Sequence, residues 1–100
     1  MSKMTNPAHP GELIRDEILP AFGLNVAQAA EALGVARPGF NNMLNGHRAL
    51  SHEMAIKIEA AFGVDAEMLV NLQTNFDLAQ ARAHTAEITA GVKRQEPIAA

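Results

Sequence analysis

Apolar residues recur at helical spacing along most of the chain, in stretches separated by glycine and proline. In the first stretch, Ile14, Ile18 and Phe22 follow Pro10, whose fixed φ suits the first position of a helix. Pro20 interrupts this pattern. The sequence therefore predicts a helix that begins near Pro10 and ends around Pro20, with the three apolar side chains on its buried face.

Residues 25–45 combine two short amphipathic patterns with a glycine between them. Asn25 is a good N-cap for the first, and Gly34 can take the left-handed conformation that ends a helix and turns the chain. Phe40, Met43 and Leu44 form the apolar stripe of the second. Such a pair is typical of the helix-turn-helix, whose second helix enters the DNA major groove. An ordinary helical hairpin is the alternative.

Two further helices are predicted after this motif. Ser51 is a good N-cap for a helix running to about Phe62, where Gly63 follows and can stop it. The apolar stripe of this helix is Met54, Ile58 and Phe62. Asp65 can cap a last helix that extends to about Ala83.

The last predicted helix carries two apolar lines, of which one is enough to dock it on a small domain. A second line left in water would expose an apolar patch of the kind that monomers avoid. We therefore predict a homodimer interface on this helix, although isolated exposed apolar residues are common and need no partner. The predicted interface residues are Leu69, Val70, Leu72, Phe76 and Leu78.

The whole pattern predicts an all-α protein, a compact bundle of about five helices without strands or repeats. A length of 100 residues, with 48% hydrophobic residues, fits one domain with one core. That domain is predicted to span residues 9–84, after a flexible segment at 1–8 and before a tail without fixed structure at 85–100. The sequence has no apolar run of membrane-spanning length and no signal peptide, which favours a cytoplasmic protein without a membrane partner.

The net charge of −3 argues mildly against nucleic-acid binding, which usually needs a basic surface. The distribution matters more, because Arg37 and Arg48 are the only charged side chains between Gly34 and Ser51, with His47 beside the second. The predicted second helix of the motif is therefore locally positive. Since phosphate neutralisation supplies much of DNA affinity, so few cations in each chain favour a dimer as the binding form.

Several side chains around the second helix of the motif suit DNA. Arg37 can form a fork onto guanine O6 and N7 or onto a phosphate, and Asn41 and Asn42 can pair with adenine edges, unless they are simply a solvated face. Gly39 would let the backbone approach the duplex. The predicted DNA-binding residues are Gln28, Arg37, Pro38, Gly39, Asn41, Asn42, His47 and Arg48. A dimer would read double-stranded operator DNA as an inverted repeat, with half-sites about one helical turn apart or a multiple of it.

Catalysis, a metal site and a cofactor are all disfavoured. The chain has no cysteine, and its four histidines show neither HxxxH nor HExxH spacing. No glycine-rich phosphate loop is present either. His9, before Pro10, is interpreted as a turn or capping residue.

Four motifs in this order resemble the HigA family of antitoxins, part of the Cro/CI-like (XRE) helix-turn-helix group. They are HPGE at 9–12, EALGVARPGFNNMLNG at 31–46, HRALSHEMAIKI at 47–58 and VNLQTNFDLAQAR at 70–82. The resemblance implies a lambda-repressor-like fold. It also implies a homodimer that represses its own promoter and neutralises a HigB toxin, a RelE-like ribonuclease that cuts messenger RNA on the ribosome.

Within this resemblance, the toxin should be basic because it binds RNA, so an acidic face of the first helix is a reasonable docking site. Glu12, Arg15 and Asp16 are the predicted toxin-binding residues, although a charged helix face is usually just solvated. A stand-alone regulator of the same group, without a toxin, is the alternative function. A short basic open reading frame immediately upstream would distinguish the two.

The chain departs from the family pattern in the second helix of the motif. Ala36 stands where a polar N-cap is common, and Gly39 stands where serine or threonine is common. A missing cap costs about 1 kcal/mol, and a glycine inside a helix costs about as much again. This helix is therefore predicted to be loose. Leu69 replaces a frequent tryptophan in the last helix.

Overall fold

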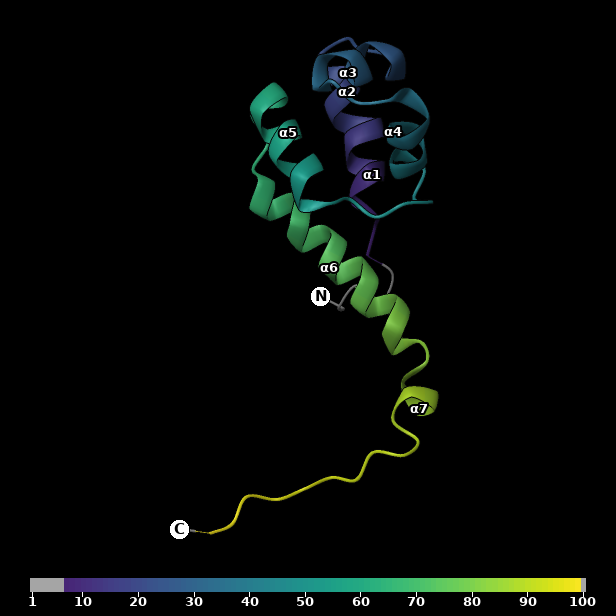
Figure 1. Cartoon of the computed structure of the whole chain (residues 1–100), viewed down its shortest axis with the longest axis vertical. Coiled ribbons are helices and arrows are strands. Elements are labelled where there is room, and N and C mark those ends of the chain that lie inside the picture. Colours follow the sequence, from purple (N-terminus) through teal and green to yellow (C-terminus); the bar gives the residue numbers. More distant parts are fainter. Residues whose placement is uncertain (1–6, 100) are drawn as a thin grey trace.

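The computed structural model describes residues 7–99, and within that range the only regular elements are helices, which confirms the predicted all-α class. Residues 1–6 of the predicted flexible segment lie outside the described residues. A first rod of three consecutive helical segments is followed by four separate helices and one short helical turn (Figure 1). The rod is α1 (Pro10–Leu13), η1 (Ile14–Ile18) and α2 (Leu19–Ala21), followed by α3 (Val26–Leu33), α4 (Arg37–Leu44), α5 (His52–Phe62), α6 (Ala66–Arg82) and α7 (Thr85–Ile88).

The first rod passes through Pro20, where the sequence pattern predicts its end. Residues 14–18 form a π-helical segment, in which the amide of Leu19 donates to the carbonyl of Ile14, five residues earlier. In an α-helix the ring of Pro20 would clash with the carbonyl four residues earlier, and its missing N–H would leave a gap in the hydrogen-bond ladder. The wider π turn relieves this conflict, so the rod continues to Ala21.

Phe22 was predicted on the buried face of this rod, and that prediction is wrong. Its side chain is 52% exposed, whereas Ile14 and Ile18 are buried as expected. The rod has ended by residue 22, so Phe22 leaves the core face and its ring lies 5.0 Å from that of Phe62, at the end of α5.

The helix-turn-helix forms at residues 25–45 as predicted. Asn25 and Gln28 build a reciprocal capping box at the start of α3. Gly34 ends α3 with φ 70°, and the following amide of Val35 donates to the Ala30 carbonyl at 3.0 Å, which fixes the turn. α4 then begins at Arg37 without a side-chain cap, as the alanine at position 36 requires.

The start of α1 lies directly against the end of α4. A Cβ at Gly11 would overlap the main-chain carbonyl of Met43 and lie 2.9 Å from the Cα of Leu44. Only glycine permits this approach. His9 caps the same end, since its Nδ1 accepts a hydrogen bond from the Gly11 amide at 2.9 Å. The HPGE segment therefore holds the first rod against the helix that follows the motif's turn.

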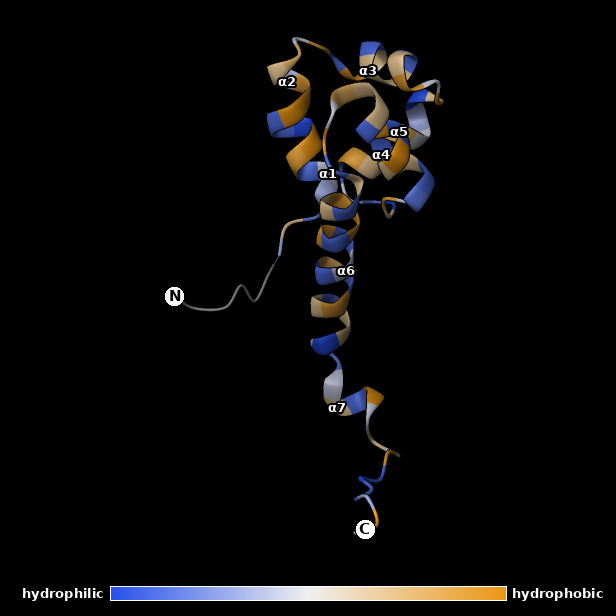
Figure 2. Ribbon diagram, turned by 90° about the vertical axis from the view of Figure 1, so that its left-hand side faces the viewer, coloured by the Kyte–Doolittle hydropathy of each residue, from blue (hydrophilic) through white to orange (hydrophobic). Residues whose placement is uncertain are grey.

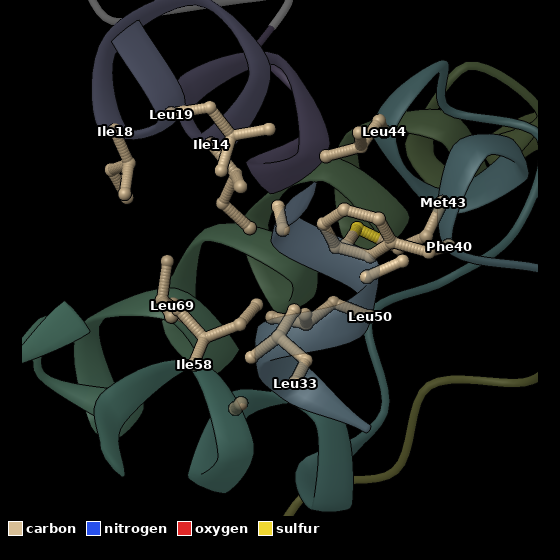
Figure 3. Packing of buried hydrophobic residues seen from close by; sticks show 13 residues of the cluster. Ile14, Ile18, Leu19, Leu33, Phe40, Met43, Leu44, Leu50, Ile58 and Leu69 are labelled. Carbon is tan, nitrogen blue, oxygen red and sulfur yellow. The ribbon is translucent and has the colours of Figure 1, made fainter. Parts of the chain in front are cut away.

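One apolar core joins the first rod, α3, α4, α5 and α6. In Figure 3 the labelled side chains come from the first rod, α3, α4, the loop after α4, α5 and α6. The largest fully buried side chains are Phe40, Ile14, Met43, Leu44, Ile58, Leu69 and Pro10. Because α4 contributes three of them, its inner face is held firmly by tertiary packing.

α6 docks on the domain through its N-terminal half, next to α5 and α1. Leu69 was predicted in the dimer interface, and that prediction is wrong, because its side chain is fully buried within the chain. Val70 packs partly against the same core. Leu72 and Phe76 are half-buried, and Leu78 is 45% exposed.

Beyond this docked half, α6 projects away from the domain, and the rest of the chain continues from its far end (Figure 1). α7 is a single helical turn within the segment predicted to lack fixed structure, and residues 92–99 have no regular structure. Figure 2 shows hydrophobic and hydrophilic residues alternating along the projecting part of α6. The chain measures 58 × 31 × 29 Å.

Candidate nucleic-acid interface

The outer face of α4 carries the polar side chains predicted to read DNA. Arg37, Pro38, Asn41 and Asn42 are all exposed, while Phe40 on the opposite face is buried. The three ion pairs found among the described residues do not include Arg37. Its guanidinium therefore remains available to a base edge or a phosphate.

Arg48 lies against the first turn of the same helix. A Cβ built on Gly39 would lie 2.9 Å from Nη1 of Arg48. Both residues line a hollow of about 320 Å³ between α4 and the start of α5. The structure thus brings together two of the predicted DNA-binding residues, Gly39 and Arg48, in direct contact.

The loop after α4 is held onto the end of that helix. The amide of His47 donates to the Asn42 carbonyl at 2.8 Å, and the side chain of Asn45 donates to the Asn41 carbonyl at 3.1 Å. His47 and Arg48 are both exposed. These bonds give the loop a fixed position beside the polar face of α4, which suits contacts to phosphates.

Gln28 lies in the first turn of α3 and is exposed. Its Oε1 accepts a hydrogen bond from the Asn25 amide at 2.9 Å, so this oxygen is used within the capping box. The NH₂ group of the side chain is the part left to donate to a DNA phosphate.

Two buried polar residues, His9 and Gln73, support this surface, and the sequence pattern indicates only the first of them. His9, interpreted from the sequence as a turn or capping residue, does cap α1, and its ring meets that of Phe76 edge-on at 5.0 Å. Gln73 was missed: its Oε1 accepts from the Leu50 amide at 2.8 Å, and its Nε2 donates to Asp77 at 2.9 Å. A single glutamine on an otherwise apolar helix line gives no local signal of such a role.

Burial lowers the pKa of His9 below its ordinary value, while a hydrogen bond to the Arg48 main chain and the carboxylates of Asp77 and Glu12 oppose this shift. Because Nδ1 accepts from the Gly11 amide, the neutral ring carries its proton on Nε2. His9 therefore connects α1, the loop after α4 and α6 in its uncharged form.

The predicted toxin-binding residues Glu12, Arg15 and Asp16 are all exposed on the first rod. Arg15 forms two hydrogen bonds to Asp16, at 2.8 and 3.0 Å, which lower the pKa of that carboxyl. Arg15 also donates to the side chain of Asn45 at 3.3 Å. Asp16 therefore stays ionised and is already paired with Arg15, and this face borders the end of α4.

Among residues 7–99, no group of three or more histidine, cysteine, aspartate or glutamate side chains could hold a metal ion. Within the same range, no helix has both the length and the apolar character needed to cross a membrane.

Comparison with known proteins identifies the family. The Helix-turn-helix family model matches residues 14–69. Virulence-associated protein A' of Dichelobacter nodosus is 42% identical over 79 residues, covering 78% of this chain and 68% of that protein. Antitoxin HigA-1 of Vibrio cholerae is 38% identical over 72 residues, covering 72% of this chain and 68% of that protein.

Solved structures match over most of the chain. Antitoxin GraA has a TM-score of 0.83 and 39% identity, covering 93% of this chain and all (100%) of its own. Pseudomonas aeruginosa antitoxin HigA, solved with the higBA promoter, has a TM-score of 0.82 and 35% identity, covering 91% of this chain and 100% of its own. A family model that matches more than half of the chain, together with these relatives, confirms the resemblance seen in the sequence. This protein belongs to the HigA family of antitoxins, within the Cro/CI-like helix-turn-helix group.

Proposed function

We propose that this protein is a repressor that binds its own operator DNA through α4 and serves as the antitoxin of a type II toxin-antitoxin pair. The observation that carries the proposal is the outer face of α4, where Arg37, Asn41 and Asn42 are exposed, with Arg48 against Gly39 of the same helix. The HigA relative solved with the higBA promoter supports DNA as the ligand. The proposal places the protein in the cytoplasm, where operator DNA and messenger RNA are accessible.

We propose a homodimer as the DNA-binding form. A single domain offers few cations to phosphates, whereas two copies double that number and read two half-sites. Leu72, Phe76 and Leu78 are the apolar side chains of α6 that retain exposed surface for a second copy. The operator should accordingly be an inverted repeat.

Fluorescence anisotropy tests the DNA-binding part of the proposal. The full chain is titrated against a labelled duplex from the region upstream of its own gene and against a shuffled duplex of equal length. We expect affinity for the first to exceed that for the second by about 10³-fold or more at physiological salt. Equal affinities for the two duplexes would contradict sequence-specific binding.

The toxin partner is tested separately. We expect the product of a short basic open reading frame beside this gene to stop growth alone, and co-expression of this chain to restore growth. The exposed carboxylates of Glu12 and Asp16 give a proposed docking face for a basic toxin. Glu12→Lys should then reduce rescue, with Glu53→Lys on α5 as the matched control. If no neighbouring product is toxic, the stand-alone regulator remains.

A further inference from the structure

At Gly39 of α4, the space that a side chain would fill is taken by another residue. The atoms of other residues within 4 Å of its ideal Cβ position, outside the helix's own backbone, are Nη1 of Arg48 at 2.9 Å and Cζ of Arg48 at 3.8 Å. The contact joins a helix position to a loop residue that follows the same helix. The space left by glycine is therefore filled by a guanidinium group.

This position is electrostatically unfavourable for the isolated chain. The first turn of α4 carries the positive end of the helix dipole, and Ala36 supplies no capping oxygen there. Arg37 begins the same turn, and neither arginine belongs to an ion pair among residues 7–99. The guanidinium of Arg48 thus lies at the N-terminal turn of α4 without an ion-paired carboxylate among residues 7–99, an arrangement that a phosphate would stabilise.

We propose that Gly39 is a positioning residue for DNA binding, because its missing Cβ leaves room for the guanidinium of Arg48 against α4, where that guanidinium binds a phosphate of the DNA backbone. The inference rests on the proposed DNA-binding function and deepens it. It gives Gly39 a different role from the one expected from sequence, in which glycine allowed the helix backbone itself to approach the duplex.

The chain offers a variant that separates this role from folding. In Gly39→Ala, the new methyl group meets the far end of a flexible side chain, so Arg48 can move aside without disturbing the core. Alanine also favours the helix over glycine. We expect the Tm of Gly39→Ala to equal that of the wild type or exceed it by up to about 8 °C.

The test is a double-mutant cycle of Gly39→Ala and Arg48→Ala, titrated against the operator duplex and a shuffled duplex at several salt concentrations. Each single variant should weaken binding to both duplexes by about three- to tenfold and reduce the slope of log K against log salt by about 0.9, the value for one phosphate. The double variant should bind no more weakly than Arg48→Ala alone. Gly91→Ala, in the exposed tail with nothing within 4 Å, is the matched control.

Two results would overturn the inference. An unchanged affinity and salt slope for Gly39→Ala would show that the contact of Arg48 with Gly39 does not contribute to DNA binding. Additive losses in the double variant would show that glycine acts through its own backbone rather than through Arg48. If the wild type does not prefer the operator over the shuffled duplex, this result counts against the proposed function instead. The comparison of variants on the shuffled duplex still tests the contact of Arg48 with Gly39.

Discussion

Arg37 occupies the first position of α4, exposed and without an ion pair among the described residues. If its guanidinium forms the predicted fork onto a guanine, Arg37→Ala should weaken operator binding by about 1–3 kcal/mol and relax the preference at one base pair. Anisotropy against the operator and single-base variants measures both effects. Arg82→Ala, which removes an exposed cation at the far end of α6, should leave affinity nearly unchanged. Equal losses for the two variants would remove Arg37 from base recognition.

His9 predicts a pH dependence of stability. Its native pKa is lowered, mainly by burial, whereas the unfolded chain takes up the proton near the ordinary value of 6.5. Below that pH the unfolded state therefore binds more protons at this residue than the native state. The contribution of His9 to the free energy of unfolding is complete above pH 6.5, and it is lost as the pH falls toward the lower native pKa.

Urea unfolding at about pH 7.5 and about pH 5.5 measures this loss. His9→Asn keeps a side-chain oxygen that can accept from the Gly11 amide but cannot take up a proton in this range. The free energy of unfolding should fall less for His9→Asn than for the wild type between the two pH values. Identical falls would assign the pH dependence to other groups.

At the scale of elements, the crossing of α1 and α4 depends on one glycine. Gly11→Ala would place a methyl group against the main chain of Met43 and Leu44, which cannot move aside as a side chain can. We expect the free energy of unfolding to drop by about 1–3 kcal/mol, the usual cost of overpacking. Urea unfolding with Gly91→Ala as control checks this. A variant as stable as the wild type would show that the two helices can separate at little cost.

The elements that the sequence predicted well are those with local signals. The N-cap of Asn25, the left-handed Gly34 and the N-cap of Ser51 all follow from residues within one helical turn. The apolar stripe of α4 also points inward as expected. Because these features need only neighbours in sequence, the helix-turn-helix could be placed before any tertiary contact was known.

The elements that the sequence did not predict depend on distant contacts. The π turn before Pro20 makes up for the hydrogen bond that proline cannot donate in the helix, and residue helix propensities do not indicate such a turn. α6 has two apolar lines, and its crossing of α1 and α5 decides which residues become buried, so Leu69 entered the core rather than a dimer interface. For the candidate site, the exposure of the α4 side chains could be predicted from the sequence. The contact of Arg48 with Gly39 could not, because it joins a loop residue to a helix residue nine positions earlier.

At the scale of the whole molecule, the proposed dimer depends on the outer surface of α6. Leu78 is exposed and lies in the C-terminal half of this helix, beyond the docked segment. Leu78→Lys should therefore leave the domain folded but place two charges in the interface. Sedimentation equilibrium should shift from twice the 10.7 kDa of one chain toward 10.7 kDa.

Ile56→Lys on α5 is the control, since Ile56 is also exposed but lies outside the proposed interface. It should remain a dimer with unchanged operator affinity. If Leu78→Lys remained a dimer while Ile56→Lys became monomeric, the interface would belong to α5. A wild-type chain that is monomeric at all concentrations would rule out a dimer interface on α6 and on α5.

The projection of α6 and the tail beyond the domain also affects the hydrodynamic behaviour of one copy. The radius of gyration is 17.6 Å, whereas a compact chain of this length would have about 13 Å. Friction rises with such elongation, so a lone protomer would leave a gel-filtration column early, at a volume where a rounder protein of greater mass is expected. Elution position alone would then mimic self-association, and small-angle scattering should yield a pair-distance curve with a long, low shoulder.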